Sequence, residues 1–308
     1  MKAFMPAVFL ALSAFPATAF ERMQRSACQE SFTRLADLVP DQSAEQDATA
    51  DEIARSIGVT PDGWCQFEAR STDIDLDFDV FEWRMEDTER WTRDGIPPLA
   101  LDVRVSGLDP DAFEGDQDTD RPLVDMTATL RQEPDAGLVI LERVAMENSA
   151  GDALAISGVF ERVFLSSPSM MQVSLGSATF KAGLMVLTLD GTHENPFGFE
   201  GEFYINGTEQ DRSEGAFDVL SAIPDGVIDD ASRAELMAFA ADLPKPVGKL
   251  ETSVSSERGL GLMQVAMSMV SAVESAMAEN DGRGNMMEIL LDGLTITADW
   301  TPDAQNAD

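Results

Sequence analysis

The sequence predicts an α+β protein: a curved antiparallel β-sheet meander with short N-terminal helices, and with C-terminal helices packed on the sheet. Three observations lead to this fold class. The middle of the chain alternates apolar and polar residues, turn residues separate the alternating runs, and helical patterns are confined to the two ends. Strands grouped together, with helices before and after them, are typical of α+β rather than alternating α/β proteins.

Residues 1–19 predict a secretory signal peptide. Lys2 precedes a largely apolar run from Ala3 to Phe15, and Ala17-Thr18-Ala19 places small residues at the positions that a signal peptidase reads. We therefore expect cleavage before Phe20. The apolar run is too short to cross a bilayer, so no stable membrane insertion is expected. The mature chain is predicted to be periplasmic or secreted.

Residues 20–63 are predicted to form an N-terminal helical cap. Residues 21–39 have the pattern of an amphipathic helix, and Thr49-Ala50-Asp51-Glu52 is a capping box for a second helix that Gly58 ends. The two cysteines, Cys28 and Cys65, are expected to form a disulfide, because an exported protein folds under oxidising conditions. This disulfide would tie the cap to the sheet.

Residues 64–308 are predicted to hold the sheet and the C-terminal helices in one domain. Ile74 to Val80 alternates with aspartates, and a change of phase at Phe81 predicts a β-bulge. Further strands are expected at 99–105, 123–130, 138–146, 153–163, 171–180, 184–189 and 197–205.

The C-terminal third returns to a helical period. Ser232 to Glu235 is a capping box for a helix that ends before Pro244, and residues 250–254 form a short strand. Residues 259–279 are predicted to form an apolar helix across the sheet, and residues 289–300 form the last strand.

The net charge is −35, from 56 acidic and 21 basic residues. Such a field repels phosphate backbones, so no nucleic-acid partner is expected. His193 is the single histidine and lies in a predicted turn, and no catalytic motif is present. We predict a non-enzymatic protein without a cofactor, although chemistry based on carboxylates alone stays open. The acidic stretch 109–120 leaves weak calcium binding as an alternative.

Sixteen methionines occur in the chain, several of them in the predicted helix 259–279 and in the strands it would cover. Methionine lines adaptable apolar surfaces, so a groove between this helix and the sheet is predicted to bind an apolar small molecule or lipid. The residues expected to line it are Leu262, Met263, Ala266, Met267, Met269 and Val270. The alternative is an envelope interaction protein with a packed core and no ligand, whose protein partner is unknown.

Strands such as Asp152-Ala153-Leu154-Ala155-Ile156-Ser157-Gly158, separated by Asp/Gly turns, resemble the strand-rich repeats of AsmA-like bacterial envelope proteins. The resemblance covers residues 70–210 and the final strand. It implies a curved β-sheet that can shelter lipid chains. This chain is expected to differ from them by lacking an N-terminal membrane anchor, which puts a bridging role across the envelope in doubt.

Overall fold

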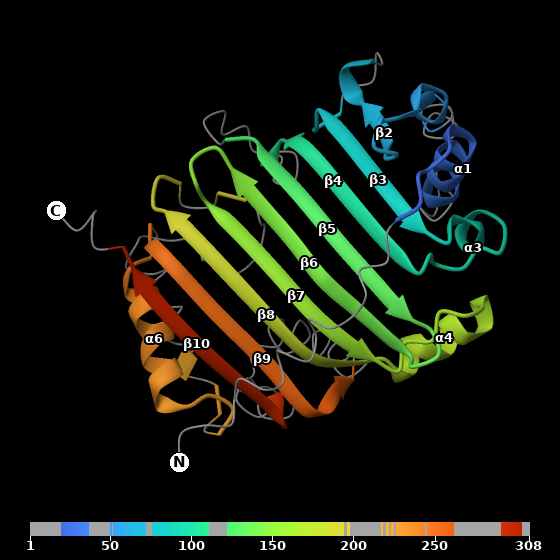
Figure 1. The fold of residues 1–308 in the computed structure, drawn as a ribbon. Coiled ribbons are helices and arrows are strands. Elements are labelled where there is room, and N and C mark those ends of the chain that lie inside the picture. The colour runs from blue at the N-terminus through green and yellow to red at the C-terminus, as the bar shows by residue number, and fades with distance from the viewer. Residues whose placement is uncertain are drawn as a thin grey trace, which may run out of the picture.

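The described part of the chain forms one open sheet of ten antiparallel strands, whose order in the sheet is their order along the chain (Figure 1). The computed structural model describes residues 20–36, 50, 52–71, 76–110, 122–193, 196–197, 217, 220–221, 223–224, 226–243, 245–261 and 291–303. The predicted antiparallel, strand-rich architecture is confirmed. The predicted signal peptide lies outside the described residues.

The strands range in length from two residues in β1 to fifteen in β9. They are β1 (Gly58–Val59), β2 (Cys65–Glu68), β3 (Val80–Glu86), β4 (Ala100–Leu108), β5 (Val124–Glu133), β6 (Leu138–Asn148), β7 (Ala153–Glu161), β8 (Thr179–Asp190), β9 (Val247–Gly261) and β10 (Leu294–Pro302).

The helices are short and lie around the sheet. They are α1 (Arg25–Ala36), α3 (Thr88–Thr92), α4 (Pro168–Ser177), α6 (Asp230–Ala241) and the 3₁₀ turn η2 (Ala69–Ser71), and residues 52–56 are also helical. Figure 1 shows α1 and α3 at the end of the sheet that carries β3, and α6 beside β10. No helix within the described ranges is long and apolar enough to cross a membrane.

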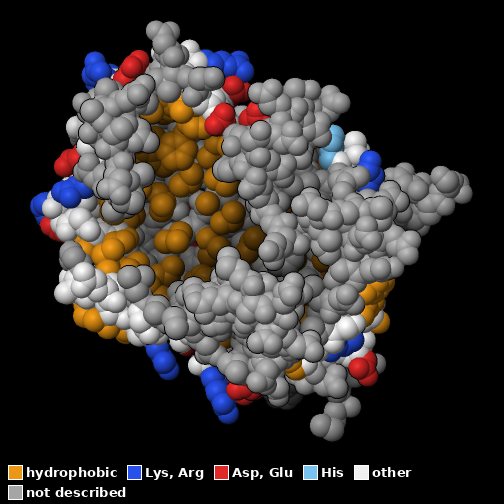
Figure 2. Space-filling model, turned by 180° about the vertical axis from the view of Figure 1, so that it is seen from behind, with side chains coloured by type: hydrophobic (Ala, Val, Ile, Leu, Met, Phe, Trp, Pro, Cys, Tyr) orange, Lys and Arg blue, Asp and Glu red, His pale blue; other side chains and the backbone are white. Residues whose placement is uncertain are grey.

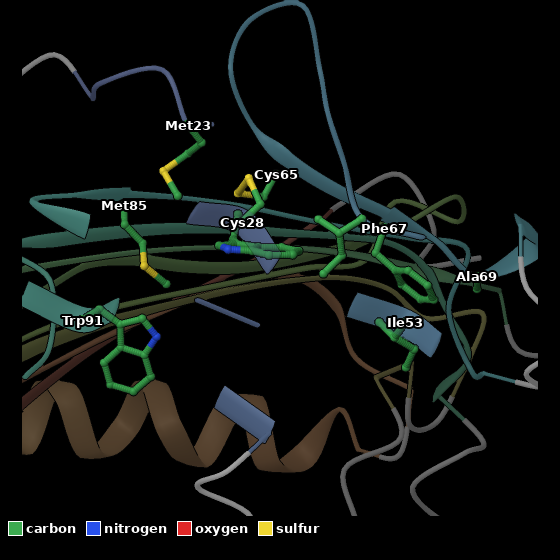
Figure 3. Close-up of a cluster of buried hydrophobic side chains, with 10 residues drawn as sticks. Met23, Cys28, Ile53, Cys65, Phe67, Ala69, Met85 and Trp91 are labelled. Carbon is green, nitrogen blue, oxygen red and sulfur yellow. A yellow bond between two sulfur atoms is a disulfide. The ribbon is translucent and has the colours of Figure 1, made fainter. Parts of the chain in front are cut away.

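A disulfide joins α1 to the sheet. Cys28 of α1 and Cys65 of β2 are bonded, with their Cα atoms 5.4 Å apart, and both are fully buried. Figure 3 shows this bond among the side chains of one core cluster, which includes Met85, Trp91 and Phe67. The predicted pairing is confirmed, and it fixes the N-terminal helix against the first strands.

Two predictions for the start of the sheet are wrong. Residues 76–79 are not strand, because β3 begins at Val80. From Val80 to Glu86 the pairing with β4 runs without a register shift, so no bulge occurs at Phe81. The apparent change of phase in the sequence reflects an irregular segment before β3, in which Asp79 N still donates to Ser106 O at 2.9 Å.

The strand predicted at 171–180 is also wrong, because residues 168–177 form α4. Ser167 caps this helix by accepting a hydrogen bond from Met170 N, and Pro168 occupies its first turn. Both residues are established signals for the start of a helix. They outweigh the hydrophobic pattern of the segment, which does not clearly favour strand or helix. Strand β8 begins only at Thr179.

The C-terminal elements differ from the prediction in their boundaries. Strand β9 extends from Val247 to Gly261, so residues 259–261 are strand and not the start of a helix. Residues 262–279 lie outside the described part of the chain. The cap of α6 is Asp229, which accepts the N–H of Ser232, whereas the prediction placed the cap at Ser232 itself. The last strand was predicted from residue 289. It begins at Leu294, because the two residues before it, 292–293, form a turn, and residue 289 lies outside the described residues.

Both edges of the sheet are protected. Strand β1 has only two residues. At the opposite edge, Ile296 N of β10 donates to Val227 O at 2.7 Å, and Trp300 N donates to Glu235 Oε2 at 3.4 Å. Short or covered edge strands prevent the addition of further strands.

Candidate ligand-binding face

The register of the strands places apolar side chains in continuous rows on one face of the sheet. Residues paired across neighbouring strands point to the same face, and alternate residues along a strand do too. One row runs through nine strands, from β2 to β10. Its members are Cys65, Trp83, Val103, Ala128, Val144, Ile156, Met185, Thr252 and Ala298.

Two further rows flank this central row. One runs from Phe67 through Met126 and Leu154 to Trp300, and the other runs from Met85 through Leu141 and Val254 to Ile296. None of the three rows contains a charged residue. We call the face that carries them the apolar face.

The opposite face carries the charged residues of the strands. Arg84 Nε donates to Asp102 Oδ2 at 2.8 Å, and Arg131 Nε donates to Glu142 Oε1 at 2.6 Å. Arg84 also lies over the rings of Phe20 and Trp64, at 4.2 and 4.4 Å from their centroids. Charged pairs and cation–π contacts therefore concentrate away from the apolar face.

Three groups cover parts of the apolar face. Helix α1 and its core cluster cover the part around Trp83, which is fully buried. Phe197 packs in a second cluster with Val124 and Leu154. At β10, the ring of Trp300 packs edge-on against Phe239 of α6, with centroids 5.1 Å apart.

The middle of the apolar face is less covered. Ala128, Leu130, Leu141 and Val144 are only partly buried, and Ile156 is 37% exposed although it belongs to a central strand. Figure 2, seen from behind the view of Figure 1, shows a hollow lined by hydrophobic side chains. We refer to Ala128, Leu130, Leu141, Val144 and Ile156 as the central patch.

A pair of glycines lies next to the central patch. Gly158 and Gly183 are cross-strand partners in β7 and β8. The rings of Phe160 and Phe180 stack edge to face beside them, with centroids 5.7 Å apart. Aromatic rings that cover strand glycines replace the side-chain contacts that glycine lacks. The glycine pair is therefore part of the packed sheet.

The six predicted lining residues, Leu262, Met263, Ala266, Met267, Met269 and Val270, lie outside the described residues. The residues that the structure brings together instead belong to the strands, and the central patch was missed. The signal was present in the sequence, because alternate residues of each predicted strand already had to share a face.

Other polar features of the described residues do not form a comparable site. Within these ranges, no three His, Cys, Asp or Glu side chains lie close enough to hold a metal ion. His193 is partly buried and follows the turn after β8. A shallow cavity of about 320 Å³ lies near Thr188, Lys249 and Asp303, but Lys249 Nζ is already paired with Glu251 at 3.1 Å.

The predicted acidic calcium loop falls largely outside the described residues. Of residues 109–120, the structure describes Asp109 and Pro110 alone.

Comparison with protein-family models, with curated proteins and with solved structures returns no match.

Proposed function

We propose that this protein is a non-enzymatic binder of an apolar ligand, such as an acyl chain, which lies on the central patch of the apolar face. The observation that carries the proposal is Ile156, an isoleucine that is 37% exposed in the middle of a ten-stranded sheet. Apolar side chains in such a position normally lose their contact with water, at a gain of about 25 cal/mol per Å². An apolar ligand would provide that burial.

The sheet geometry supports this proposal. The three apolar rows offer a continuous surface, while the edges are closed to further strands by β1 and by α6. Ligand sites are typically concave and mostly apolar, with few polar groups. The hollow seen in Figure 2 has this character.

We also infer that the mature chain is exported. Residues 1–19 have the pattern of a cleaved signal peptide, and the buried Cys28–Cys65 disulfide is typical of an oxidising compartment. N-terminal sequencing of the protein from the envelope fraction tests this inference, and it should begin at Phe20.

Binding can be measured with N-phenyl-naphthylamine, a neutral dye that fluoresces in apolar surroundings. The wild-type protein should bind the dye, and I156E should weaken binding by at least about tenfold, because a carboxylate in the patch would have to be desolvated. Native mass spectrometry with organic extraction would identify a copurifying lipid.

The matched control is V173E. Val173 is 58% exposed on α4, outside the three rows, and its substitution adds the same charge. Dye binding should be unchanged in V173E. If the wild-type protein does not bind the dye, the proposal is wrong and a packed interaction protein without a ligand is favoured. Equal weakening by both variants would show that the dye responds to net charge and would also count against the patch.

A further inference from the structure

The central row contains one hydroxyl that has no partner. Thr252 of β9 is paired with Met185 of β8 on one side and with Ala298 of β10 on the other. Along its own strand, the residues on the same face are Leu250 and Val254. Thr252 Oγ1 is buried and forms no hydrogen bond within the described part of the chain.

An unpaired buried hydroxyl is costly. Removing such a group from water without a hydrogen bond costs free energy, and most buried polar side chains in proteins are paired. By contrast, Ser253 next to it on the opposite face shares a hydrogen bond of 2.6 Å with Thr297. Thr252 is thus an exception within its own strand.

The position of Thr252 relates it to the central patch. Between Ala128 and Thr252 the central row passes through Val144, Ile156 and Met185, which is four steps from strand to strand. Neighbouring strands are about 4.8 Å apart, so this stretch is about 19 Å long. It is apolar from Ala128 to Met185 and ends at the one hydroxyl.

We propose that Thr252 is a polar subsite, at which its hydroxyl donates a hydrogen bond to a carbonyl oxygen of the bound ligand. The ligand class is then an acyl chain with an ester or ketone group, lying across the strands with its chain on Ile156 and its carbonyl at Thr252. This inference rests on the proposed function and adds the orientation and chemistry of the ligand.

Competition against the dye tests the subsite with two probes of equal chain length, dodecane and methyl decyl ketone. The ratio of their dissociation constants cancels most of the contribution of the chain. In T252V, which keeps the shape and removes the hydroxyl, the preference for the ketone should fall about three- to tenfold. T252S, which keeps the hydroxyl, should retain the preference.

The control variant is T127V, because Thr127 is exposed on the opposite face of β5 and should not affect either probe. Thermal unfolding checks that all variants fold. An unchanged ratio in T252V would overturn the subsite while leaving apolar binding in place. Failure of both probes to displace the dye from the wild-type protein would instead reject the central patch itself.

Discussion

Ser31 of α1 accepts the indole N–H groups of two tryptophans. Trp83 Nε1 donates to Ser31 Oγ at 3.0 Å, and Trp91 Nε1 donates to the backbone oxygen of Ser31 at 3.1 Å. Ser31 and Trp83 are fully buried. One helical residue therefore orients tryptophans from β3 and α3, and it holds α1 over that end of the apolar face.

Removing the Ser31 hydroxyl should destabilise the protein. In S31A the indole N–H of Trp83 stays buried but loses its acceptor, which costs about 1–3 kcal/mol. Urea unfolding followed by tryptophan fluorescence measures this change. S71A is the control, because the Ser71 hydroxyl is exposed where it donates to Glu68 O. A loss in S31A no larger than in S71A would contradict the importance of this hydrogen bond.

Opening the disulfide should have a larger effect. The bond between Cys28 and Cys65 closes a loop across 37 residues, and the chain-entropy model gives a stabilisation of about 4 kcal/mol for such a loop. Unfolding of the wild-type protein with and without reductant should show this loss. The double variant C28A/C65A is the control: it should be destabilised similarly and should not respond to reductant. A wild-type midpoint that is insensitive to reductant would contradict the expectation.

The two paired glycines of β7 and β8 should differ in their tolerance of a methyl group. A Cβ at Gly183 would lie 3.1 Å from Ser157 O and from the ring of Phe180, whereas a Cβ at Gly158 would come no nearer than 3.5 Å to any atom. We expect G183A to lose about 1–3 kcal/mol through overpacking. G158A should be neutral or gain up to about 1 kcal/mol from reduced chain entropy. Thermal unfolding of G183A and G158A checks this prediction. A G158A variant less stable than G183A would refute it.

Asp229 should make a stability contribution that depends on pH. The N–H of Ser232, and then its hydroxyl, hold the pKa of the Asp229 carboxyl below its usual value. A carboxyl with a lowered folded-state pKa stabilises above its unfolded pKa, near 3.9, and this stabilisation is lost as the pH falls through the folded value. D229N keeps a capping oxygen but removes the charge.

The melting temperature of D229N should therefore be below that of the wild-type protein at pH 7. The two values should converge on acidification below about pH 4. D230N serves as the comparison, because Asp230 is also an acid of the first helical turn but is not the cap. If the difference in melting temperature between D229N and the wild-type protein stays constant with pH, the charge of Asp229 does not contribute to stability as expected.

The sequence was sufficient to predict the type of fold, because alternation and turns are local signals. Ala153 to Gly158, for example, falls within a strand as expected. The helix at α4 escaped prediction because its residues show no clear period, although Ser167 and Pro168 mark its start. The C-terminal end of β9 was not predicted either. Its last residues, Gly259-Leu260-Gly261, continue into apolar residues whose spacing is typical of a helix.

The sequence could predict that the candidate site is apolar, but not which residues form it. An apolar surface on one face of a sheet follows from alternation, but its rows depend on register. Register shifts occur between Thr129 and Leu130, and again between Leu141 and Val144, so sequence distance alone does not align Ala128 with Ile156. The unpaired hydroxyl of Thr252 becomes visible only when its neighbours across β8 and β10 are known.

The agreement between strand order and chain order has a consequence for how the protein is made. Each strand pairs with the strand synthesised just before it, from β1 to β10. The pairs joined by short turns, β5 with β6 and β6 with β7, form hairpins quickly, since little loop entropy is lost. A chain synthesised from its N-terminus can therefore add one strand after another to a growing sheet. The Cys28–Cys65 bond can close as soon as β2 has emerged, long before β10 arrives.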